Sequence, residues 1–307
     1  MEHEIREQPG LLSAHSQRYF DELSAFASPL DIELVVLAAR GSSDNAAHYL
    51  RYLIEVFWGI PVVLAAPSVL TVFHREVRYP PSLCIGISQS GAAPDVAAVL
   101  GAMRNAGHRT LAITNTIGSA CEDAAESCLH LNIGEEKSVA ATKTFSSTLL
   151  ACYQLARSRC ESLPVPKLPD EEFLLNARSY AHDVAGLVSD ANVVFSLGRG
   201  FSFCSAQECA LKLMECALVG CKAYSTADFE HGPKALLADD AISIVFGDAP
   251  SSLREAGAKQ INALGSHEVW GPIWDAIFSQ WLALSVARLR GLDPDAPAFL
   301  KKVTKTV

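Results

Sequence analysis

The sequence predicts an α/β protein built from parallel sheets that are flanked by helices. Short, continuously apolar segments alternate with longer amphipathic ones, and the same alternation starts again in the second half of the chain. The apolar segments lack the strict alternation of a half-exposed strand, so we expect them to be buried on both faces. Strands of this kind, separated by helices, are typical of parallel sheets.

The first half of the chain contains five strand-like segments. We expect strands at residues 32–41, 60–66, 82–88, 110–115 and 128–134. Helical patterns lie between or after them, at residues 44–59, 94–107 and 139–158. The proline-rich segment 161–172 has little hydrophobic periodicity and is predicted to be a linker.

The second half repeats this pattern. Strand-like segments at 192–200 and 241–248 are each followed by a helical pattern, and EVWG (268–271) is expected to supply a further strand. When the two halves are superimposed in sequence, the strand end at Arg40-Gly41 corresponds to that at Arg199-Gly200. The same offset carries IGIS onto IVFG, which indicates a duplicated α/β unit. We therefore predict a helical segment at 1–30, a first domain at 31–160, the linker at 161–172 and a second domain at 173–307.

Composition excludes several classes of protein. The 307 residues carry a formal net charge of −9 without the clustered Lys and Arg that nucleic acids require. No apolar run reaches the ~20 residues of a membrane-spanning helix, and the mixed-charge N-terminus does not resemble a signal peptide. Nine cysteines without CxxC spacing favour free thiols in a reducing cytoplasm over disulfides or zinc. We expect no metal and no cofactor.

Hydroxyl and amide side chains gather at two strand ends of the first half. Ser88-Gln89-Ser90 separates a strand from a helix, and Ser42-Ser43 follows another strand. Ligands of open parallel sheets bind at the carboxyl ends of strands, and helix N-termini favour phosphate. The alternative is that these serines only cap helices and form turns. Because the nucleotide pattern GxxxxGK[ST] is absent, the expected ligand is a small phosphorylated metabolite.

The second half carries charged groups in an apolar setting. Glu208, Lys212 and Glu215 fall on one face of a predicted helix at 204–220. They could form an ordinary surface charge stripe, but the segment is otherwise almost uncharged, which predicts burial and a need for partners. Downstream, His231 precedes Gly-Pro, and two lysines lie close to the C-terminus; each is by itself compatible with a structural or solvated role.

Taken together, the motifs resemble a known family. GSSDN, SQSGAAPD, EEKSVAATKTF, LGRG, ALKLMECALVGCKAYSTADFEHGPKAL and LKKVTKTV occur in the order seen in tandem sugar-isomerase (SIS) domain proteins. They are most similar to the isomerase half of glucosamine-6-phosphate synthase and its stand-alone relatives, over essentially the whole chain. The resemblance implies two flavodoxin-like α/β domains, a homodimer and a small phosphorylated sugar as substrate, without nucleic acid or membrane partners.

The resemblance also implies roles for individual residues. Glu215 would move a proton between C1 and C2 of the open-chain sugar, Lys212 would lie near the sugar, and Lys302 would lie near its carbonyl end. His231 would open the sugar ring in the site of the neighbouring subunit. The expected phosphate-binding residues are Ser42, Ser43, Ser88, Gln89 and Ser90, and the expected substrate-proximal residues are Gly41, Val139, Ala140 and Glu208.

The chain departs from the synthase pattern at Ala93, Ala141 and Met214, where the synthase has threonine, serine and lysine. The segment before the first strand is also too short for the synthase's glutaminase, which supplies ammonia. We therefore expect release of ammonia, with glucosamine 6-phosphate and water giving fructose 6-phosphate and ammonia. A fructosamine-6-phosphate deglycase and an aldose–ketose phosphate isomerase remain alternatives. A non-catalytic sugar-phosphate sensor is a further alternative, although the acid–base residues argue against it.

Overall fold

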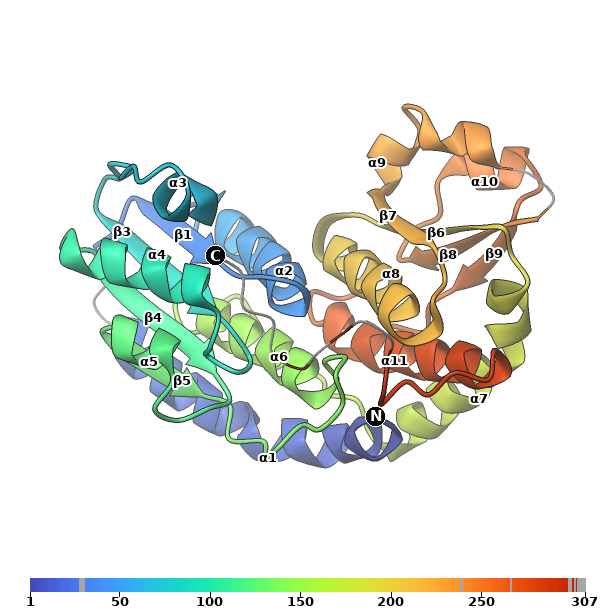
Figure 1. Ribbon diagram of the computed structural model, residues 1–307, viewed down its shortest axis with the longest axis horizontal. Helices are drawn as coiled ribbons and strands as arrows, with labels where there is room; N and C mark the ends of the chain where they lie inside the picture. Colours follow the sequence, from blue (N-terminus) through green and yellow to red (C-terminus); the bar gives the residue numbers. More distant parts are fainter. Residues whose placement is uncertain (28–30, 238–239, 266, 298–299, 301, 303–307) are drawn as a thin grey trace. The chain divides into compact units, whose positions relative to one another are not determined.

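The computed structural model describes residues 1–27, 31–237, 240–265, 267–297, 300 and 302. It contains two parallel sheets flanked by helices, as predicted from the sequence (Figure 1). The first has the strand order β2-β1-β3-β4-β5 and the second the order β7-β6-β8-β9. Every pairing in both sheets is parallel, as expected for strands joined through helices.

The first sheet is formed by β1 (Leu34–Ala38), β2 (Val62–Leu64), β3 (Ser82–Ile87), β4 (Arg109–Thr114) and β5 (Ser127–His130). The second is formed by β6 (Val193–Gly198), β7 (Cys221–Ser225), β8 (Ala241–Phe246) and β9 (Lys259–Asn262). In each sheet the first strand pairs with the second and the third, and the third pairs with the fourth. Both β3 and β8 begin and end at equivalent positions of the sequence repeat.

The first half contributes the helices α1 (Glu2–Ala27), α2 (Ser42–Phe57), α3 (Pro67–Thr71), α4 (Pro94–Asn105), α5 (Ala120–Ala124) and α6 (Lys143–Arg157). The second half contributes α7 (Glu171–Ser189), α8 (Phe203–Ala217), α9 (Thr226–Phe229), α10 (Ser251–Glu255) and α11 (Gly271–Leu289). Two 3₁₀ turns, η1 (Gly200–Ser202) and η2 (Pro233–Leu236), complete the second half. Within the described residues, no helix has both the length and the hydrophobicity that crossing a membrane requires.

The chain forms two compact units, one around each sheet. The first unit contains residues 11–135 and 147–165. The second contains residues 166–302 together with two segments from earlier in the chain, 1–10 and 136–146. The EEKSVAATKT segment therefore belongs mostly to the same unit as the second sheet, although it lies between strand and helix of the first half in the sequence.

Each sheet is buried by its own core. In the first unit, Val36 and Cys84 on neighbouring strands pack with Val96 and Leu100 of α4. In the second unit, α8 and α11 share a larger core that includes the fully buried Trp281. All nine cysteines are free and seven are buried, as predicted.

Several predicted elements differ from those observed, and three of the differences have a clear structural reason. The helix expected from residue 139 begins at Lys143, because the Glu136 carboxylate accepts the backbone N–H groups of Thr142 and Thr144 and holds the preceding residues in a loop. EVWG is not a strand: Gly271 already begins α11, and the fourth strand of the second sheet is β9. The predicted strand 128–134 ends at His130, before Asn132 takes a positive φ of 56°.

Candidate active site

The loops after β1 and β3 lie at the same edge of the first sheet, and we refer to this place as the strand-end crevice expected from the topology. These strands are neighbours, while β2 extends the sheet on the other side of β1, so the order in which strands are added reverses between β1 and β3. This topological switch point is where open α/β sheets bind ligands. The register pairs Ala38 with Gly86, which brings the loops containing Gly41 and Ser88 to the same edge.

The Ser88–Gly91 turn is held by backbone hydrogen bonds. The Ser88 amide donates to Ile113 O at 3.0 Å, and Gln89 O accepts the Asn115 amide at 2.9 Å. Gly91 has φ of 62°, and a Cβ on it would lie 2.1 Å from Ser119 Oγ. Only glycine fits both the backbone conformation and the space, so the backbone of this turn requires Gly91.

Arg40 is a functional candidate that the sequence reasoning missed. Its Nε donates to Asp95 Oδ2 at 2.7 Å, which links the end of β1 to the first turn of α4. Asp95 is 2% exposed and Arg40 is half-exposed, so the guanidinium partly faces solvent beside both serine loops. A phosphate there would meet a cation as well as hydroxyls and amides. The signal in the sequence was the arginine immediately before GSS.

In the second unit, α8 holds the predicted charged cluster. Lys212 is fully buried, with its Nζ 2.6 Å from Glu215 Oε2 and 3.4 Å from Glu208 Oε1. Glu208 is buried as well, whereas the Glu215 side chain is 24% exposed. Burial alone would lower the pKa of Lys212, but the two carboxylates raise it above its usual value. The cluster therefore has a fixed ammonium and one carboxylate that solvent or substrate can reach.

Lys302 and the Glu136–Thr144 loop also lie in the second unit. Lys302 Nζ donates to Glu136 Oε1 at 2.8 Å and to Ser138 O at 2.6 Å. Glu4 accepts the Ser138 amide at 3.1 Å, which ties the same loop to α1. Ala140 belongs to the core cluster that contains Leu213 and Cys216 of α8.

His231 follows α9 in a turn and is exposed. The preceding residue, Glu230, forms an ion pair with Lys234 at 2.9 Å. Glu215, Lys212, Glu208, His231, Lys302, Val139 and Ala140 all belong to the second unit. Of these, ion pairs join Glu208, Lys212 and Glu215 to one another, and the remaining residues share the unit with them. The five predicted phosphate-binding residues and Gly41 belong to the first unit.

One cluster in the first unit has metal-ligand chemistry. Donor atoms of Glu122, Cys128 and His130 lie within 4.8 Å of one another. Glu122 Oε2 lies 3.0 Å from His130 Nε2 and also accepts the Gly118 amide at 2.6 Å. The hydrogen bond from His130 lowers the pKa of the Glu122 carboxyl. The Glu122 carboxylate thus already has hydrogen-bonding partners in His130 and Gly118, and the absence of a metal stays a prediction.

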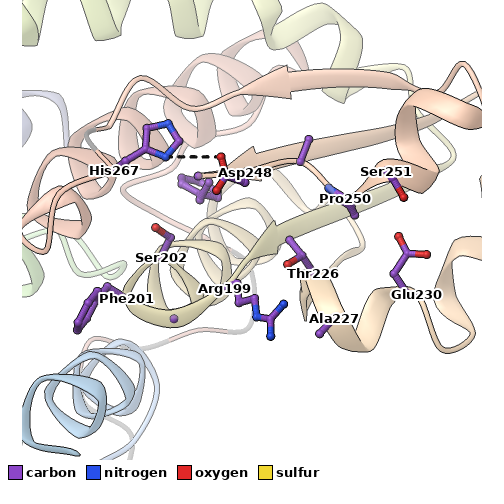
Figure 2. Close-up of a pocket in the computed structure, with 14 residues that line it drawn as sticks. Arg199, Phe201, Ser202, Thr226, Ala227, Glu230, Asp248, Pro250, Ser251 and His267 are labelled. Carbon is purple, nitrogen blue, oxygen red and sulfur yellow. Dashed lines mark ion pairs between the residues drawn. The ribbon is translucent and has the colours of Figure 1, made fainter. Parts of the chain in front are cut away.

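A cavity of about 620 Å³ lies at the strand ends of the second sheet (Figure 2). Its lining comes from the segments after β6, β7 and β8, and includes Arg199, Ser202, Thr226 and Asp248. None of the predicted site residues lines it.

Comparisons with known proteins agree with this architecture. Residues 32–158 match the SIS domain model. The chain is 30% identical to glutamine–fructose-6-phosphate aminotransferase [isomerizing] of Pyrococcus horikoshii, over 87% of this chain and 51% of that protein. The chain spans about half the length of the curated relatives it matches.

Two solved structures match nearly the full length of the chain. A "putative phosphosugar isomerase" from Silicibacter pomeroyi has a TM-score of 0.79 and 27% identity, covering 95% of this chain and 98% of that one. Glucosamine-6-phosphate deaminase from Thermotoga maritima has a TM-score of 0.80 and 22% identity, covering 99% and 98%. The chain therefore contains a SIS domain and is homologous to the isomerase domain of glutamine–fructose-6-phosphate aminotransferase.

Proposed function

We propose that this protein is a phosphosugar isomerase that deaminates an amino-sugar phosphate, converting glucosamine 6-phosphate and water to fructose 6-phosphate and ammonia. One observation carries the proposal: in α8 a partly exposed carboxylate, Glu215, is held 2.6 Å from a fully buried ammonium, Lys212. The relatives support the substrate class, since their names join fructose 6-phosphate, an amino transfer and an isomerisation.

In this proposal the first unit binds the phosphate. The hydroxyls of Ser42, Ser88 and Ser90, the Gln89 amide and the half-exposed Arg40 offer donors at the switch point of the first sheet. Binding energy from the phosphate, which takes no part in the bond changes, then positions C1 and C2 for the acid–base residues.

Glu215 is proposed to move the proton. Once the ring is open, its carboxylate removes the proton from C2 while the C1 carbonyl oxygen gains a proton, which forms an enolamine. Return of the proton to C1 and loss of one proton from nitrogen then give an imine at C2. Water adds to this imine and ammonia leaves, which balances the overall reaction. Lys212 keeps the carboxylate in place through the 2.6 Å contact, and Glu208 balances the buried ammonium from one turn away.

Lys302 and His231 have different proposed roles. The Lys302 ammonium already donates to Glu136 and to Ser138 O, so it fixes the loop that carries Val139 and Ala140 close to the sugar. A covalent imine on Lys302 would require it to leave both partners. His231 is accessible to solvent, as a residue that reaches the site of a partner subunit must be, and we propose that it protonates the ring oxygen there.

The proposal is tested by a coupled ammonia-release assay over glucosamine 6-phosphate, galactosamine 6-phosphate, N-acetylglucosamine 6-phosphate and fructoselysine 6-phosphate. We expect ammonia and fructose 6-phosphate from the first. Conversion of an aldose phosphate without ammonia would replace deamination by plain isomerisation, and lysine release from the last substrate would indicate a deglycase. Binding without turnover would indicate a sensor.

The variant Glu215→Gln links the activity to this site. It keeps the size and one hydrogen-bonding oxygen but removes the base, so turnover should fall by about 10²–10⁴-fold with little change in binding. Glu172→Gln, an exposed substitution on α7, is the matched control and should retain full activity. Full turnover by Glu215→Gln would contradict the proposed mechanism.

A further inference from the structure

The strand-end cavity of the second sheet lies at a switch point of its own. β6 pairs with β7 on one side and β8 on the other, in the order found for β1, β2 and β3. The cavity is lined by residues directly after these strands, Arg199, Thr226 and Asp248. Its volume of about 620 Å³ lies within the range of small-molecule sites. Topology and volume thus both indicate a ligand site.

The lining contains a cation without a charged partner. In the part of the chain that the structure describes, the Arg199 guanidinium forms no ion pair, and Figure 2 shows it at the cavity beside Thr226. Its counterpart in the first half, Arg40, is paired with Asp95. In the same register of the repeat, Asp95 corresponds to Arg254, so the carboxylate that neutralises Arg40 has no equivalent here.

A carboxylate, a hydroxyl and an imidazole also line the same cavity. Asp248 Oδ1 is 3.9 Å from His267 Nδ1, and both side chains are largely exposed (Figure 2). Ser202 adds a hydroxyl near Gly247, since a Cβ built on Gly247 would lie 3.6 Å from Ser202 Oγ. Because glycine has no Cβ, the space beside this hydroxyl is open to a ligand. A carboxylate, a hydroxyl and an imidazole suit the hydroxyl or amino groups of a sugar, whereas an unpaired guanidinium suits phosphate.

We propose that this cavity is a second ligand site, separate from the predicted phosphate cradle, and that it binds a phosphorylated sugar. Arg199 binds the phosphate, and Asp248, Ser202 and His267 bind the hydroxyl or amino groups. The proposal does not depend on the catalytic role of Glu215, because none of the predicted acid–base residues lines this cavity.

The test counts ligands. The full chain carrying Glu215→Gln, which slows turnover, is titrated with glucosamine 6-phosphate by equilibrium dialysis, and the sugar phosphate recovered at the end is checked to be unconverted. We expect two molecules per chain, and one after the further change Arg199→Met. The affinity of the second site should fall roughly tenfold to a hundredfold, the range for losing a charged hydrogen-bonding partner. Arg254→Met removes the same charge from exposed α10 outside the cavity lining and should leave both sites intact.

Asp248→Asn tests the class of ligand. It should weaken glucosamine 6-phosphate at the second site but not inorganic phosphate, which uses only the Arg199 end. Equal weakening of both would overturn the sugar assignment. A single ligand that Arg199→Met leaves unchanged would overturn the site itself. A single ligand lost in Arg199→Met would support this site and contradict the phosphate cradle of the first unit, so the two proposals fail separately.

Discussion

The strand ends of the two sheets have the same topology and opposite chemistry. At the first sheet the arginine after the first strand is paired with Asp95, the turn after the third strand is held by backbone hydrogen bonds, and serines line both loops. At the second sheet the corresponding Arg199 has no ion pair among the described residues, and the loops surround a cavity of about 620 Å³. The two strand ends therefore differ in charge, because a carboxylate pairs with the arginine of the first sheet and none pairs with that of the second among the described residues.

The helices that follow the first strand of each sheet, α2 and α8, also differ in their charged groups. In α2, the comparable pair of titratable residues is Asp44 and His48. Burial raises the pKa of Asp44 and lowers that of His48, which favours the neutral form of each. In α8, Glu208 and Lys212 are both buried with their charged groups 3.4 Å apart, and although burial lowers the pKa of Lys212, the neighbouring carboxylates raise it above its usual value. Among the described residues, α8 of the second unit therefore carries a buried charge network, whereas α2 of the first unit does not.

The largest expected effect comes from Lys212→Met. Removing the ammonium leaves the Glu208 carboxylate buried without its counter-ion, which should lower the free energy of unfolding by about 3–5 kcal/mol. Urea denaturation measures this change, with Lys259→Met on exposed β9 as the control. Adding Glu208→Gln should restore part of the loss, because it removes the unpaired charge. Equal stability of Lys212→Met and wild type would show that the network is solvated.

Asp275 of α11 extends the contrast to pH. It is fully buried, and burial raises the pKa of its carboxyl from 3.8 to about 7, although the nearby Ser205 hydroxyl and Gly265 backbone lower it. Between these pH values the folded protein holds a proton that the unfolded chain has released. This contribution to stability is complete below pH 3.8 and is lost as pH rises through 7.

Unfolding free energies of wild type and Asp275→Asn, measured from pH 4 to pH 8, should therefore diverge. The wild type should lose about 4 kcal/mol relative to the variant as pH rises, since each pKa unit corresponds to about 1.4 kcal/mol. Asp183→Asn, whose side chain is 70% exposed, should follow the wild type. Parallel curves for wild type and Asp275→Asn would refute the burial argument.

Substituting alanine for glycine in each of the two turns, at Gly91 and at Gly247, shows how tightly each turn is packed. Gly91→Ala combines a positive φ of 62° with a Cβ placed 2.1 Å from Ser119 Oγ, so we expect a loss of about 2–4 kcal/mol. Gly247→Ala has φ of 84° but only ordinary contacts, so it should cost about 1–2 kcal/mol from the backbone alone. Thermal unfolding of the two variants side by side measures the difference. A larger loss for Gly247→Ala would mean that the second turn is the tighter one.

The smallest effect is expected from Asp95→Asn, which makes the first crevice electrostatically similar to the second. The amide still offers an oxygen to Arg40 but no longer neutralises it, so inorganic phosphate should bind about fivefold more tightly, or ~1 kcal/mol. Asp123→Asn, an exposed carboxylate of the same unit, should not change the affinity. Calorimetric titration with phosphate measures the affinity. If Asp95→Asn bound phosphate no better than wild type, the proposed phosphate site of the first unit would be contradicted.

Most of the fold could be predicted because burial on both faces leaves a local signature. β1, β3, β4, β6 and β8 are continuously apolar or nearly so, and all were predicted close to their observed bounds. β7 was missed because four of its five residues are at least partly exposed and its pattern is mixed. EVWG was misread because a short apolar run at a helix start looks the same as a strand.

Among the candidate residues, the α8 cluster was predictable and the Lys302 contacts were not. Glu208, Lys212 and Glu215 are three and four residues apart, so helical geometry alone places them together, and the observed contacts of 3.4 and 2.6 Å agree. Lys302 contacts Glu136 across 166 positions of sequence, which no local pattern encodes. Arg40 was visible as an arginine, but its partner Asp95 lies 55 positions away.

The sequence by itself determined the alternation of strands and helices, the internal repeat and the charged face of α8, because each can be read from spacing along the chain. Only the tertiary structure decided that residues 1–10 and 136–146 belong to the same compact unit as the second sheet, that Asp95 neutralises Arg40, and that a cavity opens beside Arg199. The physical reason is that ion pairs and cavities depend on side chains brought together from distant segments, and hydrophobic periodicity carries no information about which segments those are.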